Sequence, residues 1–297
     1  MTNTVAPTAF YCCALRARDA ARPQPICGDT FAQRFMDDAR WEQMAPLIRL
    51  RGPAESNAAR HRIIDDLLRE ELARDPRHRV LILGAGFDTR AFRLPGGRWW
   101  EFDDAALFDF KEQRLPAAQA PHPLTRRATD FASETPVHYL APLASDEPTT
   151  VVLEGVSMYL PHAALAELAA TIRRLLPNAR FVCDLISPKF RARYSGHLRA
   201  ELLKLGARFA DEPTHARGAI ENEGWYLVER LSIVDRARRA GLLPVPGWLL
   251  ATFLRELRDG YAIYVFEPER DPERIAPDLQ TAVQTGALPA PGLVPTG

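Results

Sequence analysis

The residues most able to do chemistry begin with a glycine turn, Gly84-Ala85-Gly86, which directly follows the apolar run Val80 to Leu83. A short apolar run of this kind predicts a strand buried on both faces, as in a parallel sheet covered by helices. Glycine allows a tight turn and lets a ligand approach the backbone closely. A glycine turn after a buried strand is typical of the first loop of a nucleotide-binding βαβ unit.

The residues after this turn restrict the kind of nucleotide. The dinucleotide-binding fingerprint has a third glycine three positions after the second, and here that position is Thr89. Asp88 lies where a diphosphate would bring further negative charge, so a nicotinamide or flavin dinucleotide is disfavoured. A nucleoside without phosphates avoids this repulsion. S-adenosylmethionine is such a ligand and carries a sulfonium cation, so we expect it to be the cofactor, bound against Gly84, Ala85 and Gly86.

A second strand, predicted over residues 98–103, ends in an acid. Asp103 is placed to accept hydrogen bonds from both hydroxyls of a ribose. Glu101 lies on the same face of the predicted strand and could share this role. The alternative is that Asp103 only caps the helix that follows it.

Three motifs together make the sequence recognisable. They are LGAGFDTRAFRL at the glycine turn, EFD followed by Lys111, and LEGVSMYLP. Together they resemble the leucine carboxyl methyltransferase family, which includes O-methyltransferases acting on bacterial polyketides and other natural products. The resemblance extends over about residues 10–267. It implies a Rossmann-like class I methyltransferase fold and S-adenosylmethionine as the methyl donor.

The resemblance also implies roles for residues outside the glycine turn. Arg60, in the motif AARHRIID, would hold the carboxylate of the cofactor, a task that suits the two-pronged guanidinium group. Asp130 and Phe131 would contact the adenine. Glu154 would contact the cofactor, and Tyr159 would line the neighbouring acceptor region. Without the resemblance, Arg60 would be interpreted as a solvated helix residue and Asp130 as a turn residue.

Three more charged residues have open roles. Arg16 or Arg18 could supply a second cation near the cofactor's carboxylate. Asp184, near the end of the fifth predicted strand, could face the pocket or only end the strand.

The cysteines have neither metal-site spacing nor the pattern of a disulfide framework, so we expect reduced thiols, no metal and a cytoplasmic location. They are Cys12, Cys13, Cys27 and Cys183.

The hydrophobic pattern predicts an α/β fold with a doubly wound, seven-stranded sheet and a helical cap. The strands are expected at residues 80–83, 98–103, 126–131, 149–154, 179–186, 225–231 and 261–267. The last two are expected to include one antiparallel edge. Helices are expected after caps at Asp29 and Ser56, in the segment that follows Asp103, and over 161–176, 190–205, 234–240 and 248–257.

We expect a single domain. Its parts are an N-terminal helical cap over 8–75, a cofactor-binding half over 76–186, a cap insertion over 187–224, the last strands over 225–267 and a mobile tail over 268–297. The N-terminal part is expected to break at Pro23, Pro25, Pro46 and Pro53, and residues 1–7 to form a loose tail.

The composition excludes several classes of protein. Lys plus Arg number 38 and Asp plus Glu number 38, so no net charge favours binding to nucleic acid or to an anionic membrane. No apolar run approaches the roughly 20 residues of a membrane span, and the N-terminus does not read as a signal peptide. The sequence leaves the oligomeric state open.

The expected reaction is an in-line displacement in which an acceptor oxygen attacks the methyl group on sulfur. A carboxylate is ionised near neutral pH, whereas a phenol, with a pKa of about 10, would profit from a base. No histidine stands out as catalytic, which favours a carboxyl or acidic hydroxyl acceptor on a small molecule. Aromatic residues of the cap would select this acceptor or would only pack the core: Phe31, Phe35, Trp41, Phe190 and Tyr194.

Two rival functions remain open at this point. One is a nicotinamide-dependent oxidoreductase on the same sheet topology. The other is a protein that binds S-adenosylmethionine without turnover.

Overall fold

The computed structural model describes residues 7–50, 53–131, 133–210 and 216–269. Most of the predicted loose N-terminus and mobile tail, and residues 211–215 of the cap insertion, lie outside the described residues. Within this part of the chain, seven strands form one sheet in the order β3-β2-β1-β4-β5-β7-β6, which confirms the predicted fold class. The strands are β1 (Arg79–Leu83), β2 (Arg98–Asp103), β3 (Leu124–Ala128), β4 (Thr149–Leu153), β5 (Ala179–Ile186), β6 (Trp225–Ser232) and β7 (Tyr261–Pro268).

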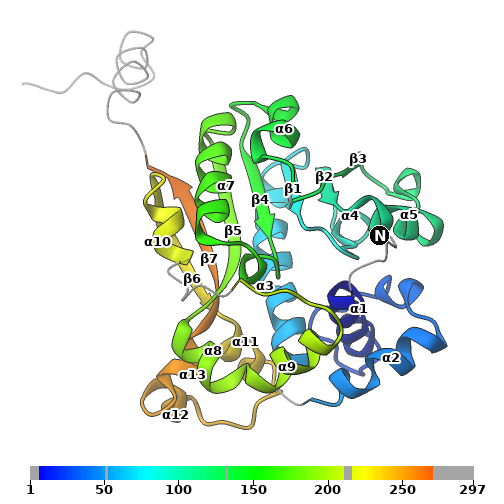
Figure 1. Cartoon of the computed structure of the whole chain (residues 1–297), viewed down its shortest axis with the longest axis vertical. Helices are drawn as coiled ribbons and strands as arrows, with labels where there is room; N and C mark the ends of the chain where they lie inside the picture. The colour runs from blue at the N-terminus through cyan, green and yellow to red at the C-terminus, as the bar shows by residue number, and fades with distance from the viewer. Residues whose placement is uncertain (1–6, 51–52, 132, 211–215, 270–297) are drawn as a thin grey trace, which may run out of the picture.

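Helices lie on both sides of this sheet and beyond one end of it (Figure 1). The α-helices are α1 (Pro7–Ala20), α2 (Asp38–Ile48), α3 (Pro53–Arg74), α4 (Arg90–Arg93), α5 (Ala105–Arg114), α6 (Pro136–Leu140), α7 (His162–Leu175), α8 (Pro188–Tyr194), α9 (Gly196–Lys204), α10 (Ala216–Glu221), α11 (Ile233–Arg239), α12 (Gly247–Ala251) and α13 (Arg255–Asp259). Short 3₁₀ turns are η1 (Ala32–Phe35), η2 (Ala117–Gln119), η3 (Ala141–Leu143) and η4 (Ser157–Tyr159). No helix among the described residues has the length and apolar character that crossing a bilayer requires.

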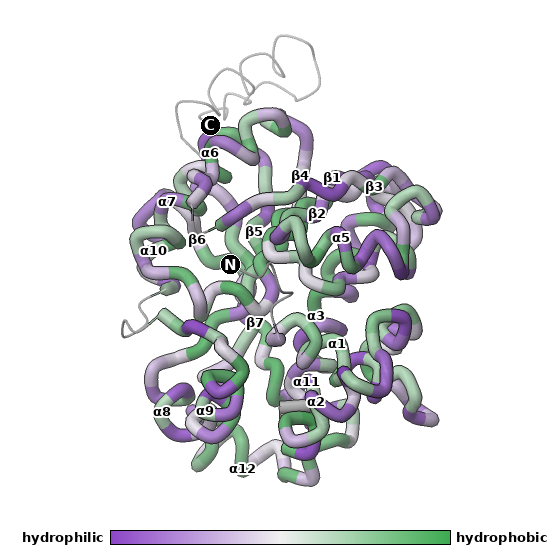
Figure 2. Tube along the Cα trace, turned by 45° about the vertical axis from the view of Figure 1, so that its right-hand side comes forward, coloured by the Kyte–Doolittle hydropathy of each residue, from purple (hydrophilic) through white to green (hydrophobic). Residues whose placement is uncertain are grey.

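Alternation along the central strands explains the two helical layers. On β1, Leu81 and Leu83 pack with α6, α7 and α10, whereas Val80 and Ile82 pack with α3 and α11. Because successive side chains of a strand point to opposite faces, a strand with helices on both sides must be apolar throughout. Figure 2 shows this as mostly hydrophobic central strands and helices of mixed character outside them.

The strands β1 to β5 are mutually parallel, and β7 runs antiparallel to both of its neighbours, β5 and β6. The expected antiparallel strand therefore exists, but it lies one position inside the sheet. The edge itself is β6. The third strand ends at Ala128, earlier than predicted, because Ala128 pairs with Asp103, the last residue of β2.

Two long helices predicted in the second half of the chain are each divided. The predicted helix 190–205 becomes α8 and α9, which meet at Ser195, whose hydroxyl donates to the carbonyl of Arg191 at 2.6 Å. The predicted helix 248–257 becomes α12 and α13, and Thr252 makes the same kind of bond to Trp248 at 2.8 Å. Side-chain hydroxyls that bond the backbone in this way compete with a regular helix.

The N-terminal helices also differ from the prediction. α3 begins at Pro53 rather than after Ser56, and Pro46 lies inside α2 instead of ending it. The residues after Asp29 form only the 3₁₀ turn η1. The Asp29 side chain does not cap that turn. Its carboxylate is fully buried and accepts from Arg16 at 2.9 Å and from the hydroxyl of Thr89 at 2.6 Å, so it joins α1 to the segment after β1.

The N-terminal helices pack against the carboxyl end of the sheet. Phe87, just after the glycine turn, lies 4.9 Å from Phe10 of α1 and 4.7 Å from Phe35 of η1, measured between ring centroids. Leu202 of α9 joins the same apolar cluster. Figure 1 shows α1, α2, α8 and α9 gathered beyond this end of the strands, where parallel α/β sheets bind ligands.

We predict that Gly84→Ala destabilises the protein strongly. Gly84 has a φ of +68°, and an added Cβ would lie 2.4 Å from Cγ2 of Val156. Backbone strain and the steric clash together should lower the free energy of unfolding by about 2–4 kcal/mol in urea denaturation. Gly218→Ala in α10 is the matched control, because its added Cβ meets nothing within 4 Å. That variant should be unchanged or more stable by up to about 1 kcal/mol, and equal losses in both would contradict the analysis.

Candidate functional site

The glycine turn leaves β1 in a conformation that requires glycine. Gly84 and Gly86 have φ angles of +68° and +49°, which other residues rarely adopt. The N–H groups of Gly84 and Ala85 both donate to the carbonyl oxygen of Phe102, at 2.9 and 3.0 Å. The turn is therefore fixed against β2, with the backbone of Gly86 beside the end of that strand.

Asp103 ends β2, and its carboxylate lies against this turn. Oδ2 accepts from the N–H of Gly86 at 2.7 Å, and Oδ1 accepts from the N–H of Asp104 at 2.8 Å. Burial raises the pKa of Asp103, although both N–H bonds oppose that shift. A carboxylate oxygen has two lone pairs, so each oxygen can still accept a hydroxyl. The cap of α5 is Asp104, which accepts from Ala106, and not Asp103.

Glu101 lies elsewhere and has a structural role. It is fully buried, and its Oε2 accepts from Lys111 Nζ at 2.7 Å and from Arg126 Nε at 2.9 Å. These ion pairs join α5 and β3 to β2. The structure therefore gives no support to Glu101 as a second ribose ligand.

Asp130 and Phe131 follow β3 next to the end of β2, where the N–H of Thr129 donates to the carbonyl of Asp103 at 2.9 Å. Asp130 is exposed, and its Oδ2 accepts from the hydroxyl of Ser133 at 2.7 Å. Phe131 packs edge-on against Tyr139, with ring centroids 5.5 Å apart. An acid and an aromatic ring thus lie close to Asp103 in the fold.

Glu154 follows β4, and its carboxylate is enclosed by cations. Oε1 accepts from Arg60 Nε at 3.0 Å, and Oε2 accepts from Arg90 Nη2 at 2.7 Å. Its side chain is only 9% exposed. Burial alone would favour the neutral acid, but the positive charges of Arg90 and Arg60 hold the pKa of Glu154 well below its usual value.

Arg60 of α3 reaches three partners at the ends of β4, β5 and β7. Besides Glu154, its Nη1 donates to Asp184 Oδ2 at 3.1 Å and to the hydroxyl of Tyr261 at 2.7 Å. Among the described residues, the one hydrogen-bond partner of Nη2 is the Cys12 sulfur, at 3.9 Å. Because Nη2 has two N–H groups, it can still donate to an anion, although the other two nitrogens are engaged.

His61, the next residue of α3, links Glu154 to a second arginine. Nδ1 lies 3.2 Å from Glu154 Oε2 and 2.7 Å from Arg90 Nη2, and Nε2 lies 2.8 Å from Arg93 Nη2. Arginine can only donate, so each ring nitrogen of His61 lies against a donor. Burial and the nearby charge of Arg90 lower the pKa of His61, so the ring is neutral near pH 7.

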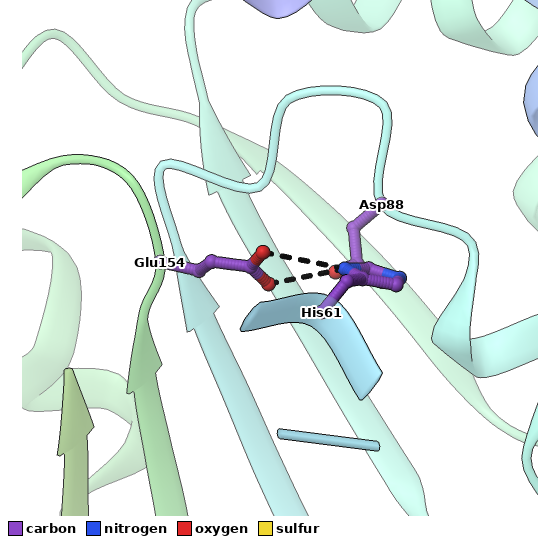
Figure 3. Close-up of side chains that lie close together, drawn as sticks. All are labelled: His61, Asp88 and Glu154. Carbon is purple, nitrogen blue, oxygen red and sulfur yellow. Dashed lines mark hydrogen bonds and ion pairs between the residues drawn. The ribbon is translucent and has the colours of Figure 1, made fainter. Parts of the chain in front are cut away.

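Figure 3 shows His61, Asp88 and Glu154 converging, each with a potential metal-ligating atom within 4.8 Å of the others. Guanidinium groups already occupy this space. Arg90 is fully buried and donates to Asp88 at 2.5 Å, to Asp65 at 2.7 Å and to Glu154. A buried cation among three carboxylates leaves no reason to add a metal ion.

This arrangement also corrects one argument from the sequence. Asp88 was expected to repel a bound diphosphate, but it is buried and paired with Arg90, so its charge is compensated. Thr89 is buried as well, bonded to Asp29. The local acid therefore does not itself disfavour a dinucleotide.

Tyr159 lies in η4 beyond Glu154. Its ring stacks on Phe209, with centroids 5.1 Å apart, and its hydroxyl bonds the side chain of Thr8 on α1. Burial raises the pKa of Tyr159, so the phenol stays protonated at neutral pH. The loop after β4 is thereby joined both to α1 and to the insertion after β5.

The open roles of three charged residues can now be described. Asp184 faces the candidate site, because its Oδ1 accepts from the N–H of Gly155 at 2.6 Å and its Oδ2 from Arg60. Arg16 is buried and donates to Asp29 and to the carbonyl of Phe87 at 2.7 Å. Arg18 donates to the carbonyl of Ile48, away from this cluster.

Comparison with known proteins identifies the family. Residues 9–173, more than half of the chain, match the leucine carboxyl methyltransferase family. The chain belongs to this family. A Streptomyces coelicolor protein named "Putative S-adenosyl-L-methionine-dependent methyltransferase" is 28% identical over 268 residues, which cover 80% of this chain and 87% of that protein. A Mycobacterium avium protein with the same description is 28% identical over 81% of this chain and 84% of its own length.

Solved structures support the same fold. A DUF574 family protein from Streptomyces avermitilis has a TM-score of 0.56 at 14% identity and covers 90% of this chain and 98% of its own. A Thermobifida fusca structure described as a "putative methyltransferase" has a TM-score of 0.54 at 14% identity, over 86% of this chain and 94% of its own. Family membership confirms the predicted class of reaction, methyl transfer from S-adenosylmethionine.

Several residues of this methyltransferase's site were missed in the sequence. They are His61, Asp65, Arg90, Arg93 and Tyr261. A signal existed on α3, where His61 and Asp65 are spaced i, i+4 within the apolar stripe that includes Ile64 and Leu68. Charged side chains on a core-facing stripe require buried partners.

We predict that Arg90→Met severely destabilises this methyltransferase. The substitution would leave Asp65, Asp88 and Glu154 without the cation that all three share. Removing one partner of a buried ion pair costs about 3–5 kcal/mol, which denaturant unfolding will measure. The matched control is Arg98→Met, which removes a partly exposed pair with Glu147 and should cost at most about 1 kcal/mol. A similar small loss in both variants would show that the buried cluster is not a stabilising unit.

Proposed function

We propose that this methyltransferase transfers a methyl group to an oxygen of a small acceptor, a carboxyl group or an acidic hydroxyl of a polyketide-like molecule. The methyltransferase class follows from family membership. The oxygen acceptor is our inference from the residues around Arg60. When bound, S-adenosylmethionine supplies a methyl group on a sulfonium centre that an oxygen nucleophile can displace in line.

The carboxyl edge of the sheet fits the adenosine part of this cofactor. We assign the two ribose hydroxyls to Asp103, whose oxygens each retain accepting capacity beside the glycine turn. Asp130 would accept from the exocyclic amine of the adenine, and Phe131 would lie beside the ring. The backbone of the turn, Gly84 to Gly86, would line the adenosine because it has little side-chain bulk.

The amino-acid part of the cofactor would lie between β1 and β4. Arg60 would bind the carboxylate through Nη2 while its other nitrogens keep Glu154 and Asp184. Glu154 is ionised and would accept from the ammonium group. The positions of these charges are fixed before the cofactor arrives, which reduces the reorganisation needed on binding.

The observation that carries the choice of an oxygen acceptor is the protonation of the groups near Arg60. His61 is neutral, but its two ring nitrogens lie against the guanidinium groups of Arg90 and Arg93, at 2.7 and 2.8 Å. Burial raises the pKa of Tyr159, so the phenol cannot take a proton at neutral pH. Glu154 has a lowered pKa and is a weak base. An acceptor that is already ionised needs no base, and a carboxylate or an acidic hydroxyl meets this condition.

The acceptor would be selected by the helical cap and the loop at η4. Most cap aromatics in the prediction have packing roles: Phe35 stacks on Phe87, Phe31 lies 5.7 Å from Phe92, and Phe190 packs against Tyr194. Tyr159, in the loop after Glu154, forms a stacked pair with Phe209 of the cap insertion. We therefore propose these two as the wall on which a flat acceptor lies.

We predict that the transferred methyl group is bonded to oxygen. The enzyme should be incubated with S-adenosylmethionine carrying a ¹³C-methyl group and with a small-molecule extract of bacterial natural products. NMR of the product separates methyl on oxygen, nitrogen and carbon, and mild alkali releases methanol from a methyl ester but not from an ether. Methyl on nitrogen or carbon would contradict the proposal. Binding of S-adenosylmethionine without turnover would favour the non-catalytic alternative.

We predict that Asp103→Ala weakens S-adenosylmethionine binding by about 2–3 kcal/mol in calorimetry, because two hydrogen bonds to a charged partner are lost. Asp109→Ala is the control, since this acid is exposed on α5, the helix that follows β2. It should bind like the wild type. NADH should bind to neither protein, and a wild type that binds NADH but not S-adenosylmethionine would favour the oxidoreductase.

A further inference from the structure

Two buried polar atoms near Arg60 have no hydrogen-bond partner among the described residues. They are the hydroxyl oxygen of Tyr11 and Oδ1 of Asn57, on residues that are 5% and 7% exposed. A buried polar group without a partner destabilises the fold, so such groups are rare in native proteins. Neither atom takes part in the ion-pair cluster described above. Their partner is therefore a bound ligand or an ordered water, unless they are defects of packing.

Tyr11 lies on the face of α1 that covers the candidate site. Thr8, one turn earlier on this face, bonds Tyr159, and Cys12 contacts Nη2 of Arg60 at 3.9 Å. On the neighbouring face, Ala9 lies 3.9 Å from the point where Gly86 would carry a Cβ. Residues three and four apart share one side of a helix. Tyr11 lies near enough to both Arg60 and Tyr159 for their charges to act on its phenol.

Asn57 is on the adjacent helix, α3, one turn before Arg60. The spacing of three residues puts both side chains on one side of α3. Arg60 has only its Nη2 left for a ligand, as its other nitrogens bond Glu154, Asp184 and Tyr261. A carboxylate at Nη2 would have two oxygens to satisfy, and an adjacent ammonium would have three N–H groups. Arg60 and Glu154 alone do not meet these needs.

We propose that Tyr11 and Asn57 complete the binding site for the amino-acid end of the cofactor. The Tyr11 hydroxyl donates to the carboxylate beside Arg60, and Asn57 Oδ1 accepts from the ammonium beside Glu154. The inference rests on the proposed function, because it assumes that S-adenosylmethionine binds at this edge. Burial raises the pKa of Tyr11, so its hydroxyl remains a donor across the working pH range.

The test compares ligands that differ at this end, each measured against the wild-type protein, since decarboxylated S-adenosylmethionine also carries a sulfonium charge that the other two lack. S-adenosylhomocysteine carries carboxylate and ammonium, decarboxylated S-adenosylmethionine keeps only the amine, and 5′-methylthioadenosine lacks both. Calorimetry with Tyr11→Phe should show S-adenosylhomocysteine bound roughly 10-fold or more weakly, because a hydrogen bond to a charged group is lost. Affinity for the other two ligands should stay within about twofold. Asn57→Ala should weaken both amine-containing ligands and leave 5′-methylthioadenosine unchanged.

Stability provides an independent readout. Removing an unpartnered hydroxyl should leave the ligand-free Tyr11→Phe protein with a melting temperature equal to or above that of the wild type. Tyr226→Phe is the matched control: its hydroxyl on β6 bonds Glu267 at 2.9 Å, far along the chain from the site, and ligand affinities should not change.

The outcomes are distinct. If Tyr11→Phe and Asn57→Ala bind all three ligands like the wild type, neither atom contacts the ligand and the inference is wrong. A lowered melting temperature of Tyr11→Phe would show that the hydroxyl has a protein partner, which also overturns it. If the wild type binds none of the ligands, the proposed function itself fails.

Discussion

The carboxylate of Glu154 is the charge on which the structure of the site depends. It follows β4 directly and is almost fully removed from water, between Arg60, His61 and Arg90. An ion of this kind is costly to bury alone, and the cost is offset only when partners with good geometry surround it. Arg60 and His61 come from α3, and Arg90 comes from the segment after β1. The need to neutralise one buried acid therefore fixes how α3 and the segment after β1 meet the sheet.

The same pairs explain why the cap is held in place. α3 supplies Arg60, His61 and Asp65, and the turn of α4 supplies Arg90 and Arg93, which both bond Asp65. A second buried pair, Arg16 with Asp29, ties α1 to the loop before η1, and Thr89 joins that pair to the sheet. Rigid charge pairs at a binding edge present fixed dipoles to a ligand, which is how electrostatic preorganisation operates in enzymes.

The strands and turns that the sequence predicted correctly are those that depend on short stretches of neighbouring residues. Val80 to Leu83 and Val151 to Leu153 are short apolar runs, and both became buried central strands. Gly84 needed a positive φ, which a turn after a buried strand indicates. The breaks at Ser195 and Thr252 were missed, because a hydroxyl that bonds its own helix is one of several options for these residues.

For the candidate site, the sequence predicted the acidic residues but not the cations that pair with them. Asp103 and Glu154 were found because they follow strands, where ligands bind in α/β sheets. The compensation of Asp88 by Arg90 could not be deduced from spacing, since a residue two positions away can point in many directions in a loop. Arg60 came from the family resemblance, whereas its contacts with Asp184 and Tyr261 join residues more than a hundred positions apart. Such pairs are decided by the tertiary fold.

The most direct test of the proposed cofactor site is a crystal structure of the complex with S-adenosylhomocysteine. We predict the ribose at Asp103, the adenine beside Asp130 and Phe131, and the carboxylate within hydrogen-bond distance of Arg60 Nη2, while Arg60 keeps its contacts with Glu154 and Asp184. A nucleoside bound at another edge of the sheet, or an Arg60 that has released both acids, would contradict the claim that the buried charges form a site ready for the cofactor.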